Sequence, residues 1–115
     1  MPTGTVLEMK YAIEKYTADT FLPCVGQVFT FESAEAARIP VHLELLEVKR
    51  QSSSGRPTGF REPFALLFAL RSAEPLGRGF HRITHDDFEP ADWFLTRVLA
   101  PGRDPSLAYY EAVFG

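Results

Sequence analysis

The run of residues 63–72, PFALLFALRS, is the most apolar stretch of the chain and limits the fold more than any other segment. Its largest side chains fall at every second position: Phe64, Leu66, Phe68 and Leu70. A period of two is typical of a strand with one bulky and one slim face. A helix is the alternative, because alanine and leucine are good helix formers. Pro63 and the turn residues 75–77 leave room for about ten residues, so we predict a strand.

Five further segments have strand-like patterns. In residues 39–50 the apolar phase changes after Leu45, as a β-bulge at the corner of a small barrel would produce. Residues 86–92, which include Pro90, are predicted to form a turn, and the polar residues 51–59 a mobile loop. The predicted strands are residues 27–32, 39–50, 64–70, 80–85, 93–99 and 107–114. About six short strands predict an all-β domain, a small antiparallel barrel or sandwich.

A short helix is predicted ahead of the strands. Thr17 is a good N-cap, and Asp19 in the first turn suits the helix dipole. Pro23 limits this helix to one or two turns, and Gly26 ends it. We expect three apolar side chains of this segment to cover one end of the core: Phe21, Leu22 and Val25. Residues 1–16 carry only a thin apolar stripe, so they are assigned to an N-terminal arm and residues 17–115 to a single β domain.

Composition fits one domain with its own core. The chain has 115 residues, of which 45% are hydrophobic and ten are Phe, and a chain of this size buries about two thirds of its surface on folding. Its one cysteine cannot form an internal disulfide, which favours a reducing compartment. The first residues do not have the pattern of a signal peptide, and no apolar run approaches the ~20 residues of a membrane span. We therefore expect synthesis in the cytoplasm and no membrane partner.

The formal net charge of −3 argues against a nucleic-acid partner, because such binding needs a basic surface. A small nucleic-acid-binding barrel stays a minor hypothesis only because of one local basic set: Lys49, Arg50, Arg56 and Arg61.

Residues 81–87 come closest to a chemical site. His81, His85 and Asp86 are residue types that bind divalent metals. Positions four apart on a strand are separated by ~13 Å, which is too far to share an ion at ~2 Å without a bend. A solvated strand face is therefore favoured, and we predict no metal, cofactor or catalytic residue. Cys24 is expected to be a small buried hydrophobe, and the carboxylates Glu44 and Glu47 ordinary surface charge.

Adjacent aromatic residues are the feature that most suggests a function. Trp93 is followed by Phe94, and Tyr109 by Tyr110. Neighbouring strand residues point to opposite faces, so one ring of each pair must leave the inner face. Either a second layer covers that ring, or it joins an exposed interaction surface. The candidate interaction residues are Trp93, Phe94, Tyr109, Tyr110 and Phe114.

Five short motifs occur in an order that resembles a family of small bacterial domains known only as a domain of unknown function. They are TADxF at 17–21, VGQxF at 25–29, LELxEV at 43–48, the apolar run 64–68, and YEAVF at 110–114. The resemblance covers residues 17–114. It implies genes beside phage-tail-collar-like fibre proteins, hence an accessory or structural role, and it carries no catalytic residues.

The leading hypothesis is a non-enzymatic structural or protein-interaction module, accessory to a tail-fibre-like assembly. It would bind itself or another protein through an aromatic face and exposed strand edges, and the C-terminal strand would suit strand addition. The alternative is a small-ligand-binding or metal-binding barrel, or a minor enzyme, that uses residues 81–87.

Overall fold

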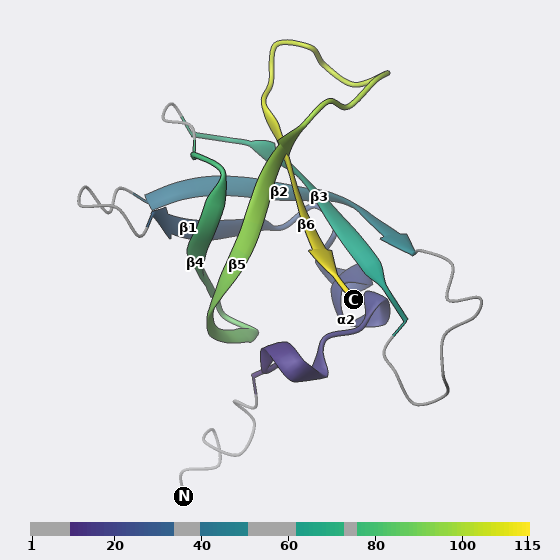
Figure 1. Ribbon diagram of the computed structural model, residues 1–115, viewed down its shortest axis with the longest axis vertical. Coiled ribbons are helices and arrows are strands. Elements are labelled where there is room, and N and C mark those ends of the chain that lie inside the picture. Colours follow the sequence, from purple (N-terminus) through teal and green to yellow (C-terminus); the bar gives the residue numbers. More distant parts are fainter. Residues whose placement is uncertain (1–9, 34–39, 51–61, 73–75) are drawn as a thin grey trace, which may run out of the picture.

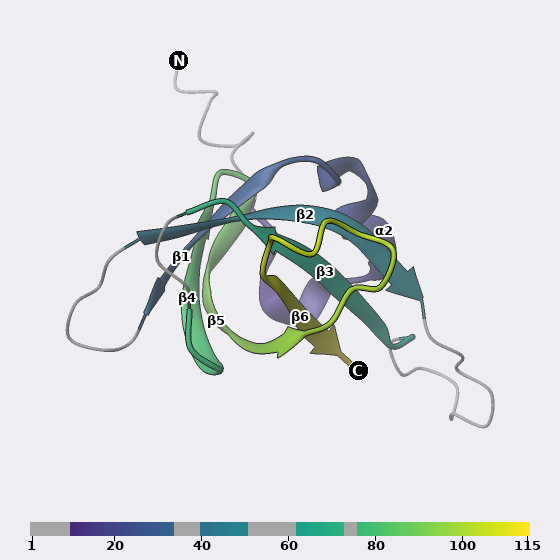
Figure 2. The ribbon, with the colours of Figure 1, turned by 90° about the horizontal axis from the view of Figure 1, so that it is seen from above.

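The computed structural model describes residues 10–33, 40–50, 62–72 and 76–115. Within these ranges six strands form a closed barrel in which every neighbouring pair is antiparallel, in the order β1-β2-β3-β6-β5-β4 (Figures 1 and 2). The strands are β1 Val28–Ser33, β2 Pro40–Arg50, β3 Phe64–Leu70, β4 Gly79–His85, β5 Phe88–Val98 and β6 Tyr109–Phe114. The all-β prediction is confirmed in its barrel form. The predicted loop at residues 51–59 lies outside the described residues.

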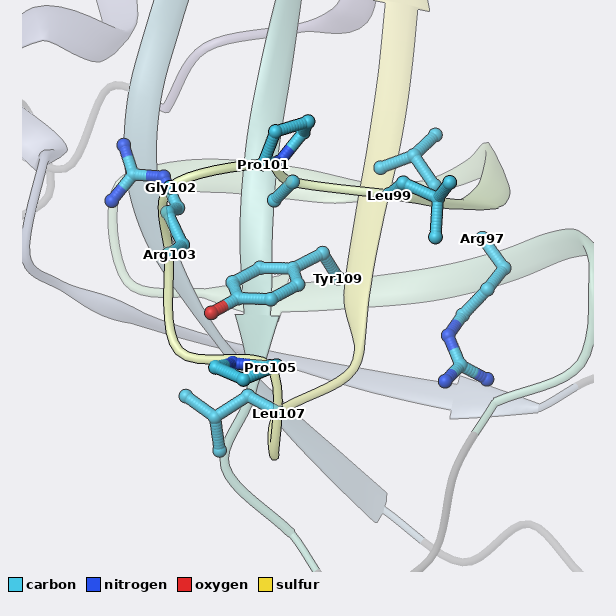
Figure 3. A pocket seen from close by; sticks show the side chains of 10 residues that line it. Arg97, Leu99, Pro101, Gly102, Arg103, Pro105, Leu107 and Tyr109 are labelled. Carbon is cyan, nitrogen blue, oxygen red and sulfur yellow. The ribbon is translucent and has the colours of Figure 1, made fainter.

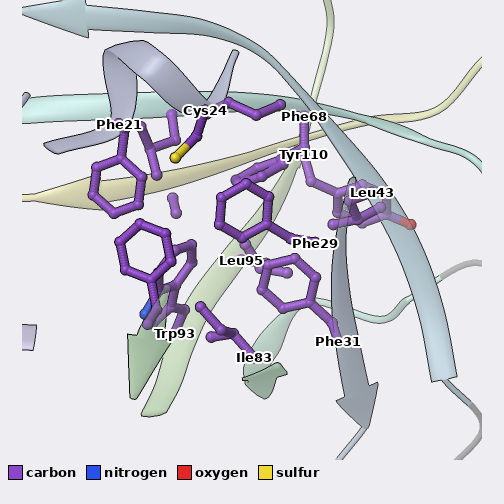
Figure 4. Packing of buried hydrophobic residues seen from close by; sticks show 14 of the residues in the cluster. Phe21, Cys24, Phe29, Phe31, Leu43, Phe68, Ile83, Trp93, Leu95 and Tyr110 are labelled. Atoms are coloured by element: carbon purple, nitrogen blue, oxygen red, sulfur yellow. The ribbon is translucent and has the colours of Figure 1, made fainter. Parts of the chain in front are cut away.

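The apolar run forms β3, as its period of two predicted. Phe64, Leu66 and Phe68 face the barrel interior and are fully buried there (Figure 4 shows Phe68 among its neighbours). Leu67 and Ala69 face outward but are also buried, in a second cluster outside the barrel. β3 therefore has apolar contacts on both faces, which explains why its sequence is apolar throughout.

The predicted bulge in β2 is present. The pairing of β2 with β3 shifts register between Leu45 and Glu47. Leu43 and Leu45 are buried before the shift, and the partly buried Val48 packs on the same core after it. The extra residue turns the strand, so that one long β2 pairs with β1 along its first half and with β3 along its second half.

The turn between β4 and β5 is shorter than predicted. β5 begins at Phe88, so Asp86 and Asp87 alone form the turn, and the prediction of a turn over residues 86–92 is wrong. Pro90 lies within the strand, where the pairing with β4 shifts between Ile83 and His85. A proline lacks the N–H that a regular ladder needs, and it is tolerated at such an irregularity.

One end of the barrel is closed by α2 (Ala18–Phe21) and the 3₁₀ turn η2 (Leu22–Cys24). Thr17 and Thr20 form a capping box at the start of α2, and Gly26 leaves η2 with φ +93°, a value that favours glycine. Phe21 is fully buried and stacks on Phe88 with centroids 4.9 Å apart. Leu22 and Val25 are exposed, so only Phe21 of the three predicted residues covers the core.

The described part of the N-terminal segment, residues 10–16, packs against the barrel. Tyr11 forms a parallel bridge with Phe88, and the 3₁₀ turn η1 (Ile13–Lys15) leads into Tyr16, which is 1% exposed. Tyr16 packs edge-on against Trp93 and Phe114. Residues 1–9 lie outside the described residues.

The opposite end of the barrel is closed by Leu76. Its backbone N–H donates to the Tyr110 hydroxyl at 3.0 Å, and that hydroxyl donates to the Leu76 carbonyl at 2.9 Å. Tyr110 is buried inside the barrel, so this reciprocal pair of bonds satisfies a buried hydroxyl while fixing the segment before β4. Side chains thus fill the barrel from end to end (Figure 4).

Candidate functional site

The structure places the two candidate metal-binding histidines in separate hydrogen-bond networks. His81 is buried, and its Nε2 lies 2.6 Å from the Gly77 carbonyl oxygen. His85 stacks on Phe29 with centroids 4.4 Å apart, and its Nδ1 accepts the Asp87 backbone N–H at 3.0 Å. Its Nε2 therefore carries the proton and donates to the Gln27 side-chain oxygen at 2.8 Å.

Asp86 lies exposed in the turn that follows. Within the described ranges no group of three His, Cys, Asp or Glu residues is arranged to hold a metal ion.

The contacts of His85 predict a pH-dependent stability. Burial lowers the pKa of His85, and the charges of Asp87 and Asp86 raise it only in part. The unfolded state, in which His85 has its ordinary pKa of about 6.5, therefore binds the proton at a higher pH than the folded state does. The contribution of His85 to the free energy of unfolding is fully present above that pH and is lost progressively as the pH falls below it. Urea titrations between pH 5 and 8 should show this decline in the wild type and a shallower one in His85→Gln. Equal slopes would contradict the prediction.

The aromatic pairs obey the expected alternation but do not form one exposed face. Trp93 and Tyr110 point into the barrel and are buried. Tyr109 points outward, but the outer cluster covers it together with Leu67 and Ala69. Phe114 is partly buried on the inner side, so Phe94 is the outward-facing exposed ring of the five candidates.

Phe94 belongs to a small patch that the sequence analysis did not identify. Phe80, directly opposite on β4, is 61% exposed, and Phe94 is 39% exposed. Their rings meet edge to face with centroids 5.1 Å apart, and the Arg78 guanidinium lies 5.3 Å from the Phe94 centroid. We call these three residues the aromatic patch. The sequence did contain a signal for Phe80. Because Ile83 faces the core, the alternation of side chains along β4 predicts that Phe80 points outward.

The aromatic patch also carries uncompensated positive charge. Four of the described arginines form ion pairs, namely Arg50, Arg71, Arg82 and Arg103. Arg78 and Arg97 make no ion pair with any described residue, and each lies over an aromatic ring instead. Gly79 pairs with Leu95, so both arginines are at the same end of the β4–β5 ladder, but Arg97 has the strand parity of Trp93 and Leu95 and lies on the other face of β5 from Phe94. The outer face of this corner therefore presents two aromatic rings beside one cation, Arg78, and these residue types are enriched at protein interfaces.

The segment between β5 and β6 forms the loop pocket, a pocket of about 570 Å³. The Tyr109 ring lies between Pro101 and Pro105 inside the loop (Figure 3), and its hydroxyl donates to the Asp104 carbonyl at 2.7 Å. The Ser106 N–H and hydroxyl donate to the Asp104 carboxylate, which lowers the pKa of Asp104. The lining residues are Arg97, Val98, Leu99, Ala100, Pro101, Gly102, Arg103, Pro105, Leu107 and Tyr109. They offer apolar surface and guanidinium groups, without a carboxylate, imidazole or thiol.

Residues 16–114 match the family described as Domain of unknown function (DUF6916). The chain belongs to this family. No curated protein and no solved structure matches it. The match begins at Tyr16, the residue that closes the barrel core, and ends at Phe114, its contact on β6. The resemblance expected from the motifs is therefore confirmed.

The remaining candidate residues, Cys24, Glu44 and Glu47, are held by burial or by ion pairs. Burial raises the pKa of the Cys24 thiol, so the cysteine is held neutral. Glu44 pairs with Arg71 at 2.7 Å and Glu47 with Arg103 at 3.3 Å. Among the described helices, none has the length and apolar character required to cross a bilayer.

The two described members of the basic set considered for nucleic-acid binding, Lys49 and Arg50, have different surroundings. Arg50 is engaged by Asp19 and Glu62, which removes its charge from that set, while Lys49 is exposed. Arg56 and Arg61 lie outside the described residues.

Proposed function

We propose that this DUF6916 domain is a non-enzymatic protein-interaction module whose aromatic patch binds a segment of a partner protein. The observation that carries the proposal is the exposed pair Phe80 and Phe94 with Arg78 above it, on a barrel that buries most of its other rings. Phenylalanine and arginine are both enriched at protein interfaces, and arginine is also enriched among the residues that supply most of the binding energy.

The chemistry of the patch favours a partner segment that combines aromatic or aliphatic residues with acidic ones. Phe80 and Phe94 offer apolar contact, and Arg78, which has no ion pair with a described residue, is available to pair with a carboxylate. Nucleic acid is the less favoured anion, because the chain has a net charge of −3 and binding to phosphates needs a broad basic surface. Within the cell, we propose a protein made in the cytoplasm that serves as an accessory component of a tail-fibre-like assembly, as the resemblance implies.

A second candidate function is binding of a small apolar ligand. The loop pocket supports it, since pockets of about 300–1,000 Å³ with mostly apolar walls suit such ligands. This candidate moves the ligand site away from residues 81–87, where both imidazoles are engaged in internal hydrogen bonds.

The proposal can be tested by affinity selection of a random 12-residue peptide library on the immobilised chain. We expect enrichment of peptides that combine acidic and aromatic residues. Synthetic copies should bind the wild type at least tenfold more tightly than the double variant Phe80→Ser/Phe94→Ser, since removal of one interface hot spot typically costs 2 kcal/mol or more, about 30-fold. Thermal unfolding should show that the double variant stays folded and loses no more than about 1 kcal/mol, the size of one cross-strand pair contact.

Leu99→Ser is the matched control. Leu99 is 92% exposed and lines the loop pocket, so this variant also removes an exposed apolar side chain. It should retain wild-type peptide affinity. Binding lost in Leu99→Ser but kept in the double variant would assign the site to the loop pocket. Equal binding by all three proteins, or preference for a dT oligonucleotide over every peptide, would refute the proposal.

A further inference from the structure

The barrel is closed between β5 and β6 by a short ladder only. The paired residues are Thr96 with Glu111, Arg97 with Tyr110, and Val98 with Tyr109. β6 pairs with β3 along its whole length, from Tyr109 to Phe114. Toward the α2 end the two strands separate (Figure 1), and among the described residues nothing pairs with residues 112–114 on the β5 side. We call these unpaired edges of β5 and β6 the seam; the rings of Tyr16, Trp93 and Phe114 fill the space behind it.

The chain itself shows that the edge of β5 accepts an extended segment. At the start of β5, the Tyr11 N–H donates to the Asp87 carbonyl at 3.0 Å, and the Glu89 N–H donates to the Tyr11 carbonyl at 3.0 Å. These bonds form a parallel bridge between Tyr11 and Phe88. Backbone groups along this edge are therefore directed away from β4 and toward an added strand. Between this bridge at Phe88 and the ladder with β6 that begins at Thr96, no described strand pairs with this edge of β5.

Side chains make the seam a suitable place for a peptide. On its inner side the rings of Tyr16, Trp93 and Phe114 pack on one another and close the core. On its outer side Val113 is 59% exposed. Val113 lies two residues beyond Glu111, and Phe94 two residues before its partner Thr96, so both are at the same level along the strands. With Phe80 paired to Phe94, an exposed apolar row crosses β6, β5 and β4.

We infer that the partner segment binds as an added β-strand in the seam. This inference rests on the proposed function and names the conformation of the partner. The segment supplies main-chain hydrogen bonds to the edge of β5 between the Tyr11 bridge and Thr96, while alternate side chains contact Phe94 and Val113. Arg78, which has no ion pair with a described residue and lies above Phe94, pairs with an acidic side chain of the segment. The segment lacks proline at the positions that donate to the edge.

N-methylation of single peptide bonds tests this conformation. The probes are the synthetic 12-residue peptides enriched by the wild-type chain, each methylated at one backbone nitrogen. A strand at an edge directs every second N–H toward its neighbour, so methylation should weaken binding at least tenfold at alternate positions and little between them. Amide hydrogen exchange should show added protection at alternate residues of β5 between positions 90 and 95 when the unmethylated peptide is bound.

The outcomes separate the inference from the proposed function. Peptides that bind through Phe80 and Phe94 but tolerate methylation at every position would overturn the added strand and leave the interaction module standing. Loss of binding at several consecutive positions would indicate a bound helix and also overturn it. Failure to select any peptide would refute both. A concentration-dependent dimer in light scattering that Phe94→Ser abolishes would assign the seam to a second copy of the chain and overturn the partner segment as its occupant.

Discussion

Replacing Tyr16 with alanine is expected to lower the free energy of unfolding by about 3–5 kcal/mol, the usual cost of deleting a large buried ring. The Tyr16 ring contacts four others at centroid distances of 5.1 to 5.6 Å, those of Phe21, Phe88, Trp93 and Phe114. These rings come from α2, β5 and β6, so no single element can move to fill the cavity. Domains are typically stable by about 5–15 kcal/mol, so the variant should unfold at a much lower urea concentration.

Urea unfolding followed by the fluorescence of Trp93, the one tryptophan of the chain, measures this effect. Tyr16→Phe is the control, because it keeps the ring and removes only the hydroxyl, at a cost of about 1 kcal/mol. An unchanged unfolding midpoint in Tyr16→Ala would contradict the prediction and mean that the segment before residue 17 contributes nothing to the core.

Replacement by alanine is expected to cost far more stability at Trp93 than at Phe94. Trp93→Ala should lower the free energy of unfolding by about 3–5 kcal/mol, because the indole packs against rings from both ends of the barrel. Phe94→Ala should cost at most about 1 kcal/mol, the size of one cross-strand pair contact. Circular dichroism against temperature or urea measures both, since Trp93→Ala also removes the fluorescent residue.

The comparison tests which face of β5 is the core. Similar large losses in both variants would mean that the ring of Phe94 is covered, and the aromatic patch could not be a binding surface. Similar small losses would contradict the burial of Trp93. Because the two positions are adjacent, the backbone surroundings are nearly the same, and the difference reports on the two faces of one strand.

Local patterns predicted the parts of this fold that depend on neighbouring residues. The alternation in residues 64–70, the phase change after Leu45 and the cap at Thr17 each have a cause within a few positions, and each is present in the structure. Pro90 misled the prediction because a proline usually marks a turn. The shifted pairing of β4 and β5 accommodates it instead, and that pairing is a property of two strands together.

Burial of the aromatic residues could be predicted only in part. The alternation correctly separates Trp93 from Phe94, but whether an outward ring is covered depends on distant segments. Tyr109 is covered because the chain before β6 folds back over it. Phe80 stays exposed because no described segment crosses the outer face of β4 at that point. The candidate site changed for the same reason. The sequence pointed to aromatic residues that are adjacent in the chain, whereas the exposed rings of the structure, Phe80 and Phe94, are paired across β4 and β5.

The contact between Tyr16 and Phe114 has a consequence for how the chain acquires its structure. β6 is the last of the six barrel strands in chain order, yet it joins β3 to β5 and supplies the ring that meets Tyr16. Until β6 leaves the ribosome, the edges of β3 and β5 and much of the interior face water. Closing the barrel between segments so far apart in the sequence makes folding slow relative to helical domains of equal size. The barrel can therefore close only after β6 has been made.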